Sequence, residues 1–201
     1  MGNRKSLQWA IVPILLVGAL LRWSAIGPMS NMLHYDEAHN GLDVLSLIQN
    51  PRLTPFMPAN FGRESLWFYI LLPFVAIWGA QPFALRLAAT MTGILTLAAL
   101  YQLGKKVLPP RAACWATLAL AVCQWHVHLS RMALRTILLP LIGVLAFWSL
   151  FQACQTDRRS HWALAGVWTG LLLYTYFSSG LWTNFWNREG GLAAIPKVRH
   201  Y

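Results

Sequence analysis

The chain has 201 residues, of which 57% are hydrophobic and 11% are charged, and its formal net charge is +10. Soluble domains carry about 25% charged residues, so this composition argues against a soluble globular protein. The apolar residues occur in blocks of roughly 15–22, about the length that a helix needs to cross a bilayer. The basic residues lie in short clusters between these blocks, a pattern typical of membrane loops, so we expect no nucleic-acid partner.

The three cysteines, Cys114, Cys123 and Cys154, lie in or at the ends of apolar blocks. Their number is odd, and no CxxC or Cys/His spacing indicates zinc. We therefore predict that they are small packing residues rather than metal ligands or redox groups.

The first apolar block runs from about residue 7 to residue 26 and follows Arg4 and Lys5. Basic residues before a span favour a cytoplasmic N-terminus. A cleaved signal peptide is the alternative, but the block is long for one and carries Arg22 near its far end. We interpret it as a retained anchor in which the Arg22 side chain snorkels towards the outer interface.

Residues 27–65 form a polar segment that holds four of the six acidic residues of the chain. Within it, the stretch from Glu37 to Gln49 groups its apolar side chains towards one side. This spacing predicts a short amphipathic helix that lies on the membrane surface. Asp36 or Tyr35 is expected at the start of that helix.

The next apolar block, residues 66–80, is short and is interrupted by Pro73. About 15 residues at 1.5 Å each extend roughly 22 Å, less than the ~30 Å hydrocarbon core. If the block spans, the cluster containing Lys105 and Lys106 falls outside, against the positive-inside rule. If the block lies at the interface, the basic clusters fall inside, and we prefer this topology.

The preferred topology is an all-α, polytopic transmembrane bundle with two juxtamembrane helices in the first extracytoplasmic loop. It predicts about five spans, near residues 7–26, 83–103, 112–129, 137–153 and 162–179. Residues 27–82 and the segment Ser130–Arg135 then lie on the same outer side.

Two acidic motifs lie in the first outer loop. The adjacent carboxylates of Asp36 and Glu37 can act as a base, as metal ligands or as a helix cap, and on spacing alone the cap is favoured. Arg63 and Glu64 begin the second short helix. There a carboxylate also interacts favourably with the helix dipole, and an arginine can anchor at the interface.

Arg131 and Arg135 are four positions apart, so the sequence predicts that they share a helical face. Because basic residues favour the cytoplasmic side, arginines on the outer side indicate a specific role. Guanidinium groups are well suited to bind phosphate oxygens. His126 and His128 precede them and are either structural or hydrogen-bonded to a substrate. Tyr174 and Tyr176 are predicted interfacial belt residues.

The order of these motifs resembles a known family. One span is followed by Tyr35-Asp36-Glu37-Ala38 and a short helix, and then by Gly62-Arg63-Glu64-Ser65-Leu66. Further matching motifs are Trp78-Gly79, Phe83-Ala84-Leu85-Arg86-Leu87 and Ser130-Arg131 to Arg135. Residues 7–180 look like the N-terminal part of polyprenyl-phosphate-dependent GT-C glycosyltransferases, in the protein mannosyltransferase, aminoarabinose transferase and RgtA/B/C/D-like group.

The resemblance implies a membrane enzyme that moves a sugar from a polyprenyl-phosphate donor, with inversion, to an acceptor hydroxyl. The acceptor would be a glycan, lipid or protein on the outer side of the plasma (inner) membrane. By analogy Asp36 is the base, Glu37 shapes the site and Glu64 lies beside the sugar or acceptor. The substrate-binding candidates are Arg63, Arg131, Arg135, Tyr35 and His128. No metal ligand is assigned, and related families differ in whether they need a divalent metal.

The sequence departs from the family pattern at two points. Ser65 stands where the motif commonly has proline, and family members run to several hundred residues. We therefore expect residues 1–180 to be the N-terminal part of a GT-C domain. Residues 181–201 would be an atypical tail, left by truncation or a frameshift, and the chain itself would then be an inactive fragment. The alternative function is a non-catalytic membrane protein, such as a transporter subunit or assembly partner.

Overall fold

The computed structural model describes residues 9–24, 26, 33–57 and 63–176, and most of them are helical. Arg4, Lys5, Gly62 and the predicted tail lie outside these residues. Two short strands, β1 (Phe56–Met57) and β2 (Arg63–Glu64), pair antiparallel. The helices are α2 (Ile11–Trp23), α3 (Tyr35–Gln49), α4 (Leu66–Trp78), α5 (Pro82–Val107), α6 (Pro110–Val122), α7 (Gln124–Arg131), the 3-10 turn η1 (Arg135–Ile137), α8 (Leu138–Thr156) and α9 (Arg159–Tyr176).

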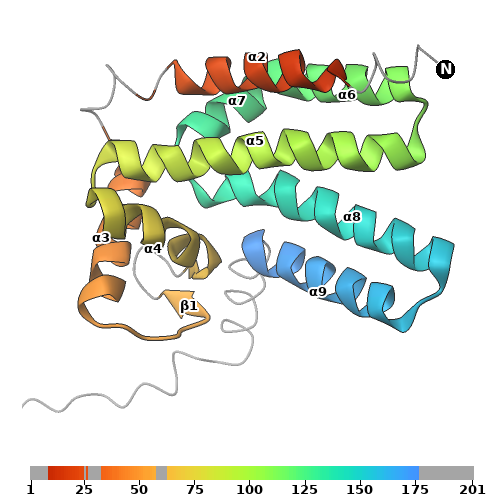
Figure 1. The fold of residues 1–201 in the computed structure, drawn as a ribbon. Helices are drawn as coiled ribbons and strands as arrows, with labels where there is room; N and C mark the ends of the chain where they lie inside the picture. The colour runs from red at the N-terminus through yellow and green to blue at the C-terminus, as the bar shows by residue number, and fades with distance from the viewer. Residues whose placement is uncertain (1–8, 25, 27–32, 58–62, 177–201) are drawn as a thin grey trace, which may run out of the picture.

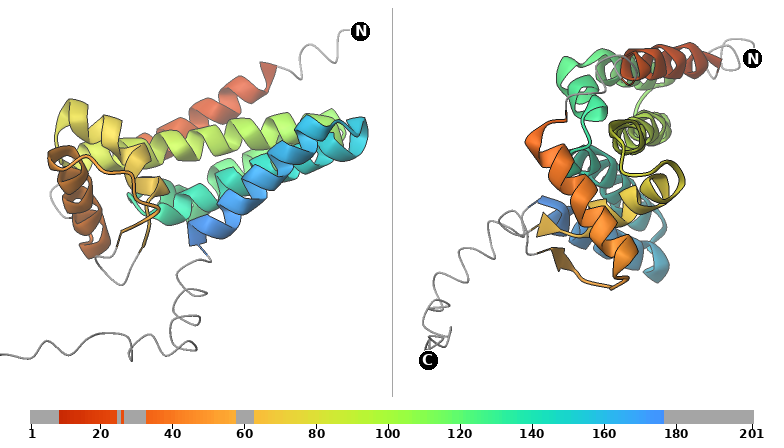
Figure 2. Two further views of the ribbon diagram at one scale, coloured as in Figure 1. Left: turned by 90° about the horizontal axis from the view of Figure 1, so that it is seen from below. Right: turned by 90° about the vertical axis from the view of Figure 1, so that its left-hand side faces the viewer.

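Helix α5 runs through the middle of the molecule (Figure 1). Helices α2, α6 and α7 lie on one side of it, and α8, α9, α3 and α4 lie on the other (Figures 1 and 2). Helix α3 crosses the end of the bundle at which α5 begins. The main core also lies at this end, where Trp67 and Phe68 of α4 pack in one cluster with Leu85 of α5 and Ile137.

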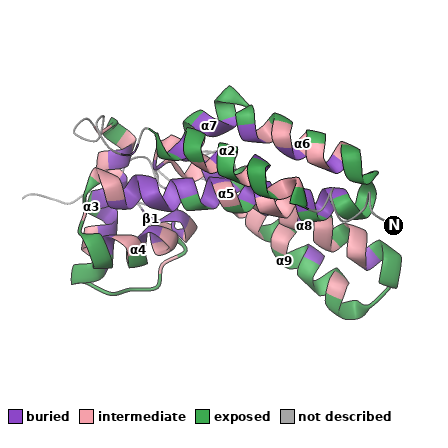
Figure 3. Cartoon of the chain, turned by 45° about the horizontal axis from the view of Figure 1, so that its top comes forward, coloured by how far each residue is buried: buried purple, intermediate pink, exposed green. Residues whose placement is uncertain are grey.

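Two helical segments of the described chain, Pro82–Val107 and Arg135–Thr156, are long and apolar enough to cross a membrane. Helix α5 is largely buried, whereas the surrounding helices expose large apolar side chains (Figure 3). Leu20 on α2, Phe147 on α8 and Val167 on α9 are all more than half exposed. Such a surface suits contact with lipid. The number of spans stays a prediction.

The amphipathic helix predicted over 37–49 is present as α3, and the short apolar block at 66–80 forms α4. Helix α4 ends where Gly79 adopts φ 79°, a left-handed conformation that favours glycine. The prediction that Arg63 and Glu64 begin the second short helix is wrong, because they form strand β2 and α4 begins at Leu66. The β1–β2 pair was not predicted, because two-residue strands carry no detectable alternation.

The block predicted as one span over 112–129 is not a continuous helix, and whether it spans the membrane stays a prediction. The helix is broken at Cys123, whose ψ of 113° is not helical, and the chain continues as the separate helix α7. Arg22 satisfies a carbonyl next to the break, because its Nη1 donates to Ala121 O at 3.0 Å. A contact between distant segments therefore accompanies the break, which local sequence does not signal.

The prediction that Arg22 snorkels to the interface is also wrong, because its side chain is fully buried between α2, α6 and α7. Nη1 also donates to Gly18 O at 2.8 Å, and Nε donates to Ser130 Oγ at 3.2 Å. Nη2 lies 2.6 Å from Nδ1 of His126. Within the described part of the chain Arg22 has no carboxylate partner, so neutral acceptors alone satisfy its donors.

We expect Gly93→Ala to destabilise the bundle. A Cβ at this position would lie 2.8 Å from Ser130 Cβ and 3.2 Å from Arg22 Nε. Overpacking of this kind costs about 1–3 kcal/mol, measurable as a lower free energy of unfolding in detergent. Gly170→Ala is the matched control, because a Cβ there meets nothing within 4 Å. Equal stability of the two variants would contradict the close packing of α5 against Ser130.

Candidate active site at the end of the bundle

Helix α3 begins with a capping box. His34 is the N-cap, and its ring accepts a hydrogen bond from the backbone N–H of Asp36 at 3.4 Å. Glu37 Oε2 accepts from the backbone N–H of His34 at 3.0 Å. Tyr35 is the first helical residue, as expected, but the capping role considered for Asp36 is wrong. A carboxylate at Glu37 completes the box because its side chain reaches back to the cap.

Glu37 joins three segments of the chain. Its carboxylate is fully buried and accepts two hydrogen bonds from Arg86 on α5, at 3.0 and 2.9 Å. The backbone N–H of Ala133 donates to the same group at 2.9 Å. Burial raises the pKa of Glu37, but these hydrogen bonds outweigh burial, so the net pKa lies below the ordinary value. Glu37 is therefore a charged structural link rather than a base.

A second buried cluster, formed by Arg63, Asp43 and Asn40, joins α3 to β2. Arg63 forms an ion pair with Asp43 and donates to Asn40 Oδ1 at 2.6 Å. Asn40 Nδ2 in turn donates to Ala133 O at 2.7 Å, and Trp67 Nε1 donates to the same carbonyl at 3.1 Å. Burial raises the pKa of Asp43, and the Arg63 guanidinium opposes this shift. The backbone of Ala133 is thus fixed by α3 and α4 together.

Glu64 faces a different arginine. Its carboxylate pairs with Arg135 Nη1 at 2.5 Å and is buried, whereas Arg135 retains partial exposure. Neighbouring residues on a strand point in opposite directions, which is why Arg63 reaches α3 while Glu64 reaches Arg135. Beside them, the Tyr174 hydroxyl accepts from Ser65 N at 3.0 Å and donates to Pro55 O. Tyr174 therefore links the residue before β1 to the residue after β2, and the belt position proposed for it stays a prediction.

Asp36 is the carboxylate that remains accessible at this end of the bundle. Its side chain is 47% exposed and lies 3.8 Å from His34 Nδ1. Tyr35 is 66% exposed and packs edge-on against His39. Burial lowers the pKa of Arg63, and the Asp43 and Asp36 carboxylates oppose this shift. Asp36, Tyr35 and Arg135 are thus the exposed or partly exposed candidates at this end of the bundle, while Arg63 and Glu64 are buried.

Arg131 and His128 do not lie in this group. Arg131 Nε donates to Leu21 O at 2.9 Å, and Nη2 donates to Ser24 Oγ at 3.0 Å, so the side chain caps the end of α2. The predicted shared helical face of Arg131 and Arg135 is wrong. Helix α7 ends at Arg131, and Met132 and Leu134 adopt extended backbone, which turns Arg135 towards Glu64.

No role was predicted for Arg86, Asn40 or Asp43. One signal was present, because Glu37, Asn40 and Asp43 are spaced by three and fall on one face of a helix. Arg86 is a cation near the start of a long apolar block, where an ionisable residue indicates a specific partner. Within the described ranges, no three His, Cys, Asp or Glu side chains group as metal ligands.

Comparison with known families gives one match. The family model described as dolichyl-phosphate-mannose-protein mannosyltransferase matches residues 65–183, more than half of the chain. The matched region includes Arg86, Arg131 and Arg135 but begins after Asp36 and Glu37. No curated protein and no solved structure matches the chain.

We expect Glu37→Gln to destabilise the protein strongly. The substitution leaves the Arg86 charge in place without its buried counter-charge, and removing one partner of a buried ion pair costs about 3–5 kcal/mol. The free energy of unfolding in detergent measures the loss. Asp157→Asn, at the opposite end of the bundle, is the control and should change little. A small loss in Glu37→Gln would show that the link is dispensable.

The same pair predicts a pH dependence. Since folding lowers the pKa of Glu37 from its ordinary value of 4.5, its stabilising contribution is complete above that pH. The contribution is lost as the pH falls through the lower, folded-state pKa. The stability difference between wild type and Glu37→Gln should therefore persist at neutral pH and shrink in acid. A difference that grows on acidification would contradict the assignment.

Proposed function

The chain belongs to the dolichyl-phosphate-mannose-protein mannosyltransferase family of GT-C membrane glycosyltransferases, and from this we propose that it transfers a sugar from a polyprenyl-phosphate donor. The acceptor is a hydroxyl group of a glycan, lipid or protein. The observation that carries the assignment of the site is the exposure of Asp36 beside buried, arginine-paired carboxylates. Family membership favours this function over a transporter subunit or assembly partner.

Asp36 is proposed as the general base. Its exposed carboxylate takes the proton of the acceptor hydroxyl while the oxygen forms a bond to the anomeric carbon. The bond from that carbon to the phosphate oxygen breaks, and the electron pair leaves with the polyprenyl phosphate. Attack from the face opposite the phosphate inverts the anomeric centre.

Arg63 and Arg135 are proposed to hold the donor phosphate. Arg63 is buried but feels the charge of Asp36, and Arg135 is partly exposed. Guanidinium groups stabilise the negative charge that develops on a phosphate leaving group. Glu64 fixes the orientation of Arg135, and Tyr35 offers an exposed ring and hydroxyl to the sugar. Arg131 and His128, predicted as substrate contacts, lie on the α7 side and receive no role in this step.

We also propose that the site faces the outer side of the plasma (inner) membrane, with the N-terminus in the cytoplasm. Lys105 and Lys106 lie at the end of α5 farthest from α3, and the α8–α9 turn with Arg158 lies at that same end (Figure 1). Basic clusters favour the cytoplasmic side of a membrane, which supports an outward-facing Asp36.

We expect Asp36→Asn to abolish most transfer, because general-base catalysis contributes about 10²–10⁴-fold to the rate. The measurement is sugar transfer from a polyprenyl-phosphate donor by the full-length protein reconstituted in vesicles. Asp157→Asn is the control, since this carboxylate lies in the turn between α8 and α9. Unchanged activity in a folded Asp36→Asn variant would refute the proposed base.

A further inference from the structure

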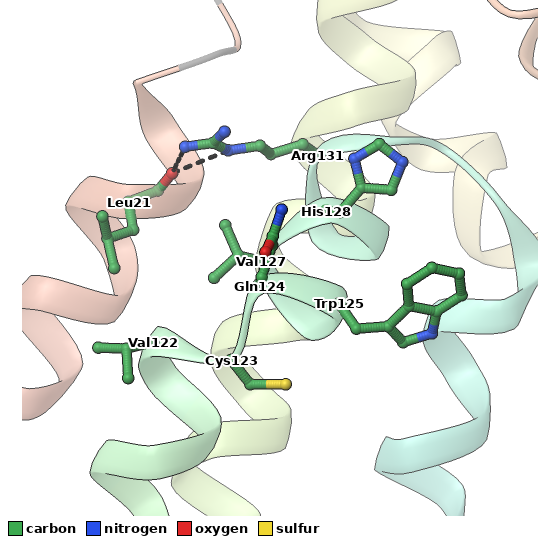
Figure 4. Close-up of a pocket in the computed structure, with 8 residues that line it drawn as sticks. All are labelled: Leu21, Val122, Cys123, Gln124, Trp125, Val127, His128 and Arg131. Atoms are coloured by element: carbon green, nitrogen blue, oxygen red, sulfur yellow. Dashed lines mark hydrogen bonds between the residues drawn. The ribbon is translucent and has the colours of Figure 1, made fainter.

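A groove lies between the end of α2 and the break that separates α6 from α7 (Figure 4). We call it the elbow groove. Its volume is about 820 Å³, and it is open to the surroundings. The lining residues combine apolar, aromatic and polar side chains: Leu21, Val122, Cys123, Gln124, Trp125, Val127, His128 and Arg131.

The polar lining comes from one face of α7. Gln124, His128 and Arg131 occupy positions i, i+4 and i+7 of this helix, which project from one side. Arg131 donates hydrogen bonds to Leu21 O and Ser24 Oγ, both at the C-terminal end of α2, and these bonds hold its side chain in place. These acceptors are neutral, so they orient the guanidinium without cancelling its charge. The groove therefore presents a positioned cation.

The described helices that form the groove carry no acidic side chain. Helices α2, α6 and α7 contain no Asp or Glu, while Arg22 and Arg131 lie at the groove end of α2 and α7. The buried Arg22 adjoins the groove residue Leu21, and its described partners are backbone carbonyls, Ser130 and His126. His126 is itself buried, and its Nε2 has no described hydrogen-bond partner. A positive potential at a partly apolar groove suits an anionic amphiphile.

The elbow groove opens at α2 and α7, whereas Asp36, the candidate base, starts α3. In Figure 1, α2 and α7 lie on one side of α5, and α3 and α4 lie on the other. The two regions are close along the chain, because Ala133, two residues after Arg131, donates to the carboxylate of Glu37. The Arg131 guanidinium nevertheless points to Leu21 O and Ser24 Oγ at the end of α2 rather than to the carboxylates of α3.

We propose that the elbow groove binds an anionic phospholipid of the surrounding membrane. Its phosphate lies against Arg131, with His128 and Gln124 at the rim, and an acyl chain follows Leu21 and Val122. The exposed Trp125 lies where aromatic rings favour the head-group region. This site is distinct from sugar transfer and does not depend on the proposed enzyme activity.

The native cysteines test the proposal directly. Cys123 lines the groove, and Cys154, also exposed, lies near the end of α8 and serves as an internal control. The full chain is placed in nanodiscs of phosphatidylcholine with or without phosphatidylglycerol, and the rate of maleimide reaction is measured at each thiol. Phosphatidylglycerol should slow the reaction of Cys123 but not that of Cys154. Equal rates at Cys123 in both nanodiscs would overturn the proposal.

Two variants identify the binding group. Arg131→Gln should weaken protection by phosphatidylglycerol about tenfold, because it removes charge-assisted hydrogen bonds to phosphate. Arg52→Gln makes the same change of charge in an exposed loop outside the groove and should leave protection intact. If both variants lose protection equally, the effect is general charge attraction and the proposal fails. Val122→Trp fills the groove at an exposed position without altering the Arg131 contact to α2, and it should also abolish protection.

A further arm distinguishes the source of the phosphate. Polyprenyl phosphate added to phosphatidylcholine nanodiscs should protect Cys123 less than phosphatidylglycerol at the same mole fraction. Stronger protection by polyprenyl phosphate, lost in Arg131→Gln, would overturn the proposal and assign the groove to the donor carrier. Asp36→Asn should not change protection in any arm, so failure of the enzyme assignment and failure of the lipid site give different results.

Discussion

The buried carboxylate of Glu37 is the constraint on which the site end of the molecule depends. It receives hydrogen bonds from the start of α3, from Arg86 and from Ala133. Removing two charges from water is expensive, and the geometry must be good for their attraction to offset that cost. Here the two oxygens accept four hydrogen bonds, so the charge is satisfied. The exposed Asp36 is positioned because its neighbour in sequence cannot move.

The short strand β2 determines the partners of two further arginines, Arg63 and Arg135. Arg63 and Glu64 project to opposite sides, so Arg63 binds Asp43 while Glu64 binds Arg135. Each guanidinium is oriented by one carboxylate but has five N–H donors, more than that carboxylate uses. A phosphate can therefore approach Arg135 without displacing Glu64. In the proposed function, this pairing would lower the cost of orienting the arginines for the donor phosphate.

Several elements could be predicted from the sequence because their signals are local. The apolar blocks gave α5 and α8, and the grouped apolar positions after Asp36 gave α3. The burial of Arg22 and the break at Cys123 could not be predicted, because each depends on a contact between α2 and residues about 100 positions later. The short strands, likewise, depend on pairing across a turn. The residue types in the sequence were enough to propose the candidate site. The partners of those residues could be identified only from the fold.

The extended residues between α7 and η1 separate Arg131 from Arg135. On a continuous helix, positions four apart project to nearly the same side, so Arg131 and Arg135 would act together. Irregular backbone at the end of a bundle is tolerated where protein groups satisfy it, and Glu37, Asn40 and Trp67 satisfy that of Ala133. The interruption turns Arg131 to α2 and Arg135 to Glu64. The same backbone that receives the Glu37 carboxylate thus directs the two arginines to different partners.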